Sequence, residues 1–296
     1  MFMKKIGIIG LGAMGFPIAE HIAASGYPLY FFARKQDVIE RAEKFGATFI
    51  PTIEELGSYA ETVIILVNTF SQCVECLNKL LRGMKKGTII IESTISHKEM
   101  EHIEKMCEPN GINVIDAPIS GGVRGAVSGN LTLMAAGDKE LVDSYIPLFQ
   151  TYSKKIVYAG NKVGKAQILK SVNQLLVGIH TIALAEAYSL GIKSGINPKV
   201  IYETIVESAG NSKIFENRGK TIIERNFERR SSLNIQKKDL NICEQLAAEN
   251  NAPLLVGTLC KQLFELAAGK FDPEEDISAV IKIYEDMCGI TEEDYC

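Results

Sequence analysis

The sequence has no marked excess of charge of either sign. Its 32 Lys and Arg residues stand against 36 Asp and Glu residues, which gives a formal net charge of -4 at pH 7. Without a basic field, neither nucleic acid nor an anionic membrane surface is expected as the main partner. A small molecule fits better, because the composition, 46% hydrophobic and 23% charged, is that of an ordinary globular protein.

Signal-peptide cores and uninterrupted apolar runs of membrane-spanning length are not expected either. The apolar run after Lys5 ends at Gly10, which is too short for the core of a signal peptide. No stretch reaches the roughly 20 apolar residues of a membrane-spanning helix. We therefore expect a soluble protein of the cytoplasm that does not bind a membrane.

The cysteines lack the paired pattern of a secreted disulfide framework. Their number, seven, is odd, and they are scattered along the chain. Cys73 and Cys76 form a CxxC motif, but no second pair or nearby His cluster completes a zinc shell. The sequence predicts no metal site and favours two positions on one helix over a redox-active pair.

The 296 residues show two halves of different pattern, and the length is near twice that of a usual domain. In the first half, short β-branched runs alternate with helical segments, as in a parallel sheet covered by helices on both faces. The predicted strands are 6–9, 29–32, 63–67, 88–91 and 113–115, and 131–136 and 156–158 could extend the sheet.

From Lys165 to Ser194 the pattern changes to a long apolar stretch without proline, which predicts a buried interdomain helix. Only helical periodicity follows, at 199–209, 234–250, 254–268 and 276–288. The predicted fold is α/β, with a Rossmann domain of doubly wound, mostly parallel sheet at 1–163. An all-α domain for substrate binding and dimerisation, interdomain helix included, is predicted at 164–296.

A glycine-rich motif, GxGxxG, follows the first predicted strand and opens a predicted helix. In this context the first glycine permits a tight turn, the second lets the backbone approach a pyrophosphate, and the third lets helix and strand pack closely. The helix N-terminus adds amides and a partial positive charge. A plain glycine-rich turn is the alternative. The expected cofactor-binding residues are Gly10, Leu11, Gly12, Ala13, Met14 and Gly15.

The end of the second predicted strand favours NADP over NAD. An acid here would bind the adenine ribose of NAD, whereas the sequence has Arg34 and Lys35 and no acid before Asp37. A guanidinium pairs with the 2'-phosphate of NADP in charge-assisted hydrogen bonds. NADP is thus the expected cofactor and NAD the alternative, and two solvated surface cations are the other interpretation of this pair.

Two later segments place polar groups in apolar surroundings. The loop from Asp116 to Gly122 sets a serine hydroxyl beside two glycine amides, which favours an anionic group such as a carboxylate, although a tight turn would look the same. In the interdomain helix, Lys170 and Asn173 share a face because they are three positions apart. A lysine in an apolar helix is costly unless paired or functional, and a snorkelling surface lysine is the alternative.

These segments, in this order, resemble the β-hydroxyacid dehydrogenase family over nearly the whole chain. The family includes 3-hydroxyisobutyrate dehydrogenase, tartronate semialdehyde reductase and the glyoxylate/succinic semialdehyde reductases. The resemblance rests on the GxGxxG motif, the loop 116–122, the segment 164–173 and the sequence Lys238-Asp239-Leu240. It implies an enzyme that transfers hydride between NAD(P) and a small 3-hydroxy acid, its semialdehyde or a 2-oxo acid.

The resemblance also implies roles for single residues. Lys170 matches the family's catalytic lysine, a general acid or base. The substrate contacts are matched by Ser120, Gly121, Gly122 and Asn173. Further cofactor contacts are matched by Val67, Asn68, Thr69, Thr94 and Lys238. Arg124 could add a carboxylate contact or be an exposed loop arginine.

Some features depart from the family and leave other functions open. Ala166 and Gln174 stand where the family often has a glycine and a second asparagine, which weakens assignment to a subfamily. A 6-phosphogluconate dehydrogenase-like enzyme would have a His at Asn173 and a much longer helical domain. An imine reductase usually lacks the lysine. A non-catalytic dinucleotide-binding protein is the remaining alternative, opposed by the intact lysine and loop.

The apolar interdomain helix also bears on assembly. It offers more hydrophobic face than one small helical domain can cover, so we expect a homodimer or tetramer.

Overall fold

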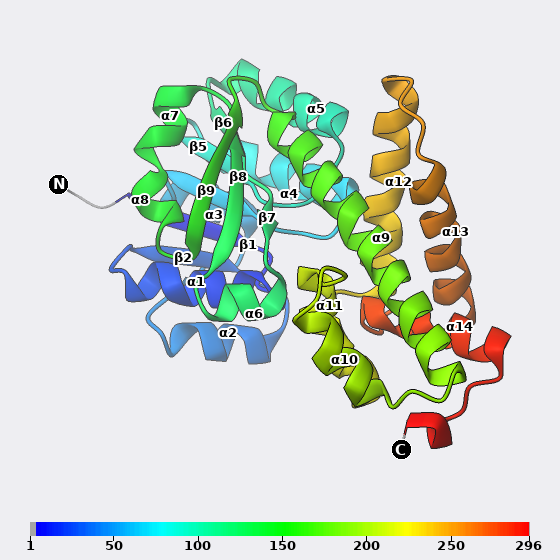
Figure 1. Cartoon of the computed structure of the whole chain (residues 1–296). Coiled ribbons are helices and arrows are strands. Elements are labelled where there is room, and N and C mark those ends of the chain that lie inside the picture. Colours follow the sequence, from blue (N-terminus) through cyan, green and yellow to red (C-terminus); the bar gives the residue numbers. More distant parts are fainter. Residues whose placement is uncertain (1–3, 296) are drawn as a thin grey trace. The chain divides into compact units, whose positions relative to one another are not determined.

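The computed structural model describes residues 4–295, which form two compact units (Figure 1). The first unit ends at Lys170 and the second begins at Ser171. The first contains the whole sheet, and the second is built of helices. This confirms the predicted α/β class with a helical second half, while the functional boundary at 163/164 stays a prediction.

The sheet of the first unit has nine strands in the order β3-β2-β1-β4-β5-β6-β8-β7, with β9 paired to β8. Strands β1 to β6 are parallel, whereas β8 runs antiparallel to β6 and β7. The bounds are β1 (Ile6–Ile9), β2 (Leu29–Phe32), β3 (Thr48–Phe49), β4 (Thr62–Ile65), β5 (Thr88–Ile91), β6 (Asn113–Asp116), β7 (Ile119–Ser120), β8 (Leu131–Ala136) and β9 (Ser153–Gly160).

The strand order reverses at β1, which pairs with β2 on one side and β4 on the other. The chain therefore leaves the carboxyl ends of β1 and β4 in opposite directions, and open sheets of this kind bind ligands in the crevice at that point. This topological switch point identifies the edge of the sheet at which a cofactor site should be sought.

Helices cover both faces of the sheet in the first unit. Successive strand residues alternate between two apolar cores: Ile64 on β4 packs in one core, and Ile65 packs in the other. The central strands β1, β4 and β5 are buried along their whole length. The helices are α1 (Gly15–Ala24), α2 (Gln36–Glu43), α3 (Ile53–Tyr59), α4 (Phe70–Gly83), α5 (His97–Cys107), α6 (Gly122–Val127), α7 (Lys139–Ser144) and α8 (Ile146–Phe149).

The long helix α9 (Lys165–Lys193) begins in the first unit and continues into the second. By length and composition this helix is apolar enough to span a membrane, which corrects the expectation that no segment of the chain would be. Core helices of soluble proteins pass the same test. The second unit adds α10 (Pro198–Val206), α11 (Lys213–Ile223), α12 (Leu233–Glu249), α13 (Leu255–Lys270) and α14 (Ile281–Cys288). Its core gathers around the buried side chains of Tyr188, Phe215 and Phe264.

Candidate active site

A pocket of about 410 Å³ lies where the carboxyl ends of β1, β2 and β4 meet. It is therefore at the switch point, as expected for an open parallel sheet. Each of the three strand ends contributes residues to its wall, and α4 closes one side. The lining residues that the sequence singled out are Gly10, Leu11, Gly12, Arg34, Lys35, Val67 and Asn68.

The three glycines of the first turn differ in their surroundings. Gly10 has φ +104°, and a Cβ there would lie 2.0 Å from the carbonyl oxygen of Leu66 on the neighbouring strand end. A Cβ on Gly15 would lie 2.0 Å from the carbonyl oxygen of Gly10. At Gly12, in contrast, a Cβ would meet nothing within 4 Å. Gly10 and Gly15 are thus required by packing, and the pocket wall is open at Gly12.

The start of α1 is suited to an anion. Met14 is its N-cap residue and forms no side-chain hydrogen bond to the first turn, which holds no acidic residue. The first amides of a helix have no partner within the helix, and its dipole adds partial positive charge there. A dinucleotide pyrophosphate fits this open, donor-rich turn. Ala13, Met14 and Gly15 adjoin the pocket in sequence but are not among its lining residues.

Arg34 has an acidic neighbour in the pocket wall that the sequence analysis missed. Its side chain is 73% exposed, and its guanidinium lies 3.6 Å from the carboxylate of Glu75 on α4. Lys79 pairs with the same carboxylate at 2.7 Å. The hydrogen bond from Lys79, and to a smaller extent the charge of Arg34, lower the pKa of Glu75. A carboxylate that stays charged competes with any phosphate for Arg34.

The loop after β4 is fixed by side chains from two other segments. The amide of Val67 donates to Oγ of Ser93 at 2.8 Å, and Ser93 follows β5. The amides of Asn68 and Thr69 donate to Oε1 of Gln72. Thr69 is the N-cap of α4 and, unlike Val67 and Asn68, does not line the pocket. The loop is therefore held in one conformation beside the switch point.

The predicted substrate loop runs from the end of β6 through β7 to the start of α6. Gly121 and Gly122 have φ of +135° and +61°, values that favour glycine. At the end of α6, the carbonyl oxygen of Val127 is hydrogen-bonded to Nε2 of His21 on α1 at 3.1 Å. Helix α6, which follows the loop, is thus attached to α1.

Lys170 lies in the first unit as a buried side chain, 6% exposed. The helix that carries it, α9, starts against β6, because the carboxylate of Asp116 accepts the amides of Gly164 and Ala166. Burial raises the pKa of Asp116 to about 7, although N–H groups from Gln167, Gly164 and Ala166 act in the opposite direction. Ser120, Thr94 and Lys170 belong to the same compact unit as the pocket, because that unit extends to Lys170.

Asn173 and Lys238 belong to the second unit, where Gln174 and Asp239 connect them. Side-chain Nδ2 of Asn173 donates to Oε1 of Gln174 at 3.0 Å, and Nε2 of Gln174 donates to Oδ2 of Asp239 at 2.6 Å. The ammonium of Lys238 lies 3.0 Å from Oδ1 of Asp239. This chain of contacts connects α9 with α12 and assigns a structural part to Gln174 that the sequence could not.

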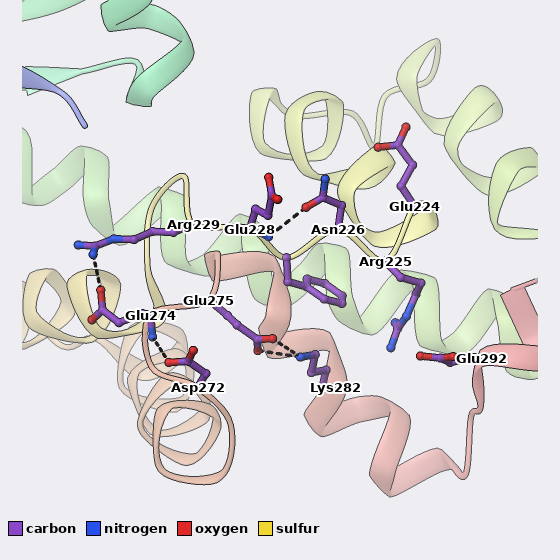
Figure 2. A pocket seen from close by; sticks show the side chains of 11 residues that line it. Glu224, Arg225, Asn226, Glu228, Arg229, Asp272, Glu274, Glu275, Lys282 and Glu292 are labelled. Carbon is purple, nitrogen blue, oxygen red and sulfur yellow. Dashed lines mark hydrogen bonds and ion pairs between the residues drawn. The ribbon is translucent and has the colours of Figure 1, made fainter. Parts of the chain in front are cut away.

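The second unit has a pocket of its own, of about 760 Å³ (Figure 2). None of the residues singled out from the sequence lines it. Arg229 pairs with Glu274 at 2.6 Å, and Lys282 pairs with Glu275 at 2.6 Å, so cations of the wall are neutralised by neighbouring carboxylates. In the described part of the chain, no three His, Cys, Asp or Glu side chains gather as metal ligands.

Comparisons with known proteins cover both halves of the chain. Residues 5–160 match the NAD binding domain of 6-phosphogluconate dehydrogenase, and residues 164–284 match the NAD-binding domain of NADP-dependent 3-hydroxyisobutyrate dehydrogenase. L-threonate dehydrogenase of Cupriavidus necator is 33% identical over 285 residues, covering 95% of this chain and 96% of that protein. The mitochondrial 3-hydroxyisobutyrate dehydrogenase of Mus musculus is 31% identical, covering 94% and 86%.

Solved structures agree with the sequence comparisons. A crystal structure of 3-hydroxyisobutyrate dehydrogenase from Salmonella typhimurium has a TM-score of 0.89 at 29% identity, covering 95% of this chain and 99% of that one. An imine reductase from Myxococcus stipitatus has a TM-score of 0.63 at 16% identity, which shows likeness of fold alone.

The open wall at Gly12 leads to a prediction about the cofactor. Gly12→Ala should leave the thermal unfolding midpoint unchanged, because no atom lies within 4 Å of the added Cβ. Binding of NAD(P)H, followed by nucleotide fluorescence, should weaken at least about tenfold, because the methyl group takes the space of an approaching pyrophosphate. Gly269→Ala, on α13 with equal free space, is the control. Unchanged cofactor affinity in Gly12→Ala would contradict the assignment of the pocket.

Proposed function

Because this chain belongs to the β-hydroxyacid dehydrogenase family of NAD(P)-dependent oxidoreductases, we propose that it transfers hydride between NADP and a small hydroxy acid. The substrate pair is a 3-hydroxy acid and its semialdehyde, or the corresponding 2-oxo acid. Residues 1–163 bind the cofactor in this proposal, and 164–296 complete the substrate site and the dimer. A cytoplasmic location remains part of the proposal.

The observation that carries the proposal is the buried Lys170 in the unit that holds the glycine turn and the Ser120 loop. Burying an ammonium group costs free energy, so a buried lysine is retained where it is paired or takes part in function. In carbonyl reduction, Lys170 donates a proton from Nζ to the substrate oxygen as that oxygen gains negative charge, and in alcohol oxidation it accepts the proton back. Bound nicotinamide supplies or accepts the hydride.

The remaining residues of the site bind and orient. We assign the substrate carboxylate to the hydroxyl of Ser120 and the amides of Gly121 and Gly122, with Asn173 as a neighbouring contact. The cofactor is held by the glycine turn and the loop Val67 to Thr69, Thr94 adjoins the nicotinamide, and Lys238 closes over it. Arg34 binds the 2'-phosphate, which fits the NADP-dependent enzyme described for the matching second domain.

The competing reactions have less support. Asn173 stands where a 6-phosphogluconate dehydrogenase-like enzyme would have a histidine, and residues 164–284 match the second domain of 3-hydroxyisobutyrate dehydrogenase. An imine reductase activity is supported only by likeness of fold.

The proposed homodimer or tetramer is supported by exposed apolar side chains on α13. Leu255, Leu259 and Leu266 recur at helical spacing, and each is about half exposed or more. Such a face on one helix is typical of an interface between subunits.

Replacing the lysine tests the chemistry. Lys170→Ala should lower kcat for NADPH-dependent reduction of small semialdehydes or glyoxylate by at least about a hundredfold, because proton transfer by a positioned acid contributes about 10² to 10⁴ in rate. The affinity for NADPH should change little. Lys165→Ala, at the exposed start of the same helix, should keep full activity. Near-normal turnover of Lys170→Ala would refute the role of this lysine.

Replacing the arginine tests the cofactor preference. Wild-type protein should prefer NADPH over NADH, and Arg34→Asp should reverse or abolish that preference, since a carboxylate repels the 2'-phosphate and can bind the free ribose. Arg82→Asp replaces an exposed arginine in the last turn of α4. It is the matched control and should leave the ratio of kcat/KM values unchanged. An Arg34→Asp ratio equal to that of wild type would argue against the phosphate contact.

Substrate charge tests the loop around Ser120. A short acid that bears an aldehyde should react well, whereas its methyl ester or amide should lose most of kcat/KM. The reason is that donors arranged for an anion are then left without a charged partner. Equal efficiency on acid and ester would refute the carboxylate site while leaving hydride transfer itself intact.

A further inference from the structure

Two fully buried polar side chains, Asp116 and Gln167, connect three segments of the first unit. Asp116 is the last residue of β6, Gln167 lies in the first turn of α9, and the third segment is the loop that follows β5. These are the segments that carry the Ser120 loop, Lys170 and Thr94.

The carboxylate of Asp116 binds the start of α9. Its Oδ2 accepts the backbone amides of Gly164 at 2.8 Å, Ala166 at 3.1 Å and Gln167 at 3.3 Å. The first amides of a helix have no partner within it, so this acid caps α9 from a strand distant in sequence. The position of the helix start is thereby set by β6.

The side chain of Gln167 uses both ends of its amide. Nε2 donates to Oδ1 of Asp116 at 2.9 Å and to the carbonyl oxygen of Ser93 at 3.1 Å. Oε1 accepts the amide of Ile95 at 3.2 Å. A side-chain amide supplies two donors and an acceptor on one planar group, whereas a carboxylate supplies acceptors only. The backbone on both sides of Thr94 is thus held by this one side chain.

The same contacts extend to the cofactor pocket. The hydroxyl oxygen of Ser93 accepts a hydrogen bond from the backbone amide of Val67, and Val67 lines the pocket. In the other direction, Lys170 follows Gln167 by three residues on α9, so the anchored turn is the one beneath the lysine.

We propose that Gln167, together with Asp116, is a positioning residue that fixes Lys170 relative to the segment around Thr94 and the loop of Ser120. The inference rests on the proposed role of Lys170 as proton donor. Catalytic groups must be held closely, because a displacement of about 1 Å can lower a rate by about 10²-fold. A helix that starts one hydrogen bond out of place would move Lys170 by a distance of that order.

Gln167→Glu should make kcat depend on pH in a way that a merely structural role of Gln167 would not. The protonated acid keeps the shape of the glutamine, accepts from Ile95 and donates one O–H to Asp116. The ionised form loses its donors and places a second carboxylate against the first. Relative to wild type, kcat should be within about threefold at pH 6 and at least about tenfold lower at pH 9.

The ratio to wild type removes the pH dependence that the two proteins share. The titratable side chains next to these contacts along the chain are the same in both proteins. They are Glu92 directly after β5, His97 at the start of α5, Asp116 on β6, and Lys165 and Lys170 on α9. A second variant, Gln167→Leu, should lower kcat at least about tenfold at every pH while NADPH affinity stays within about threefold.

Tyr145→Phe is the matched control. It removes a buried hydrogen bond of 2.8 Å between Tyr145 and Thr62, which is the first residue of β4 and lies at the opposite end of the strand from the pocket. This variant should lower the thermal midpoint and leave kcat unchanged.

If both Gln167 variants keep wild-type kcat at all pH values while Lys170→Ala is inactive, the positioning role is wrong and the proposed function stands. A kcat ratio for Gln167→Glu that does not change with pH also overturns the inference, and full activity of Lys170→Ala refutes the proposed function instead.

Discussion

The close contact between the turn after β1 and the end of β4 is the constraint on which the cofactor pocket depends. Leu66 donates its amide to the carbonyl oxygen of Ile9 at 2.9 Å, and its own carbonyl oxygen occupies the space of any Cβ on Gly10. Gly15 then lets α1 pack against Gly10. Because these two glycines bring backbone against backbone, the turn has one available path, and that path places Gly10 and Gly12 in the pocket wall.

The long helix α9 has a polar anchor in each unit. In the first, Asp116 caps its start and Gln167 holds the loop after β5. In the second, Gln174 binds Asp239 on α12. These anchors occupy buried positions that apolar side chains would fill at lower cost, and buried polar groups are retained where they specify one arrangement. A helix that carries Lys170, the proposed proton donor, needs such specificity more than it needs stability.

Buried acids at the carboxyl ends of the central strands fit the same view. Burial raises the pKa of Glu92 to about 7, although a hydrogen bond from Tyr152 acts against it, and Asp116 is affected similarly. Both acids follow or end strands of the switch-point edge. Perturbed acids gather at functional sites because the geometry of such sites outweighs the cost of desolvation.

Local patterns were enough for the Rossmann sheet, the glycine turn and the family. The runs at 6–9, 29–32 and 88–91 match their strands residue for residue, because buried parallel strands are continuous apolar segments bounded by polar turns. Strands β3 and β7, two residues each, and helix α11 carried no such signal. Glu75 beside Arg34, and Gln167 between Asp116 and Ile95, could not be found from sequence patterns. Each of these contacts joins residues far apart in the chain. Only the packing of β2, β5, β6, α4 and α9 brings them within hydrogen-bonding or ion-pair distance.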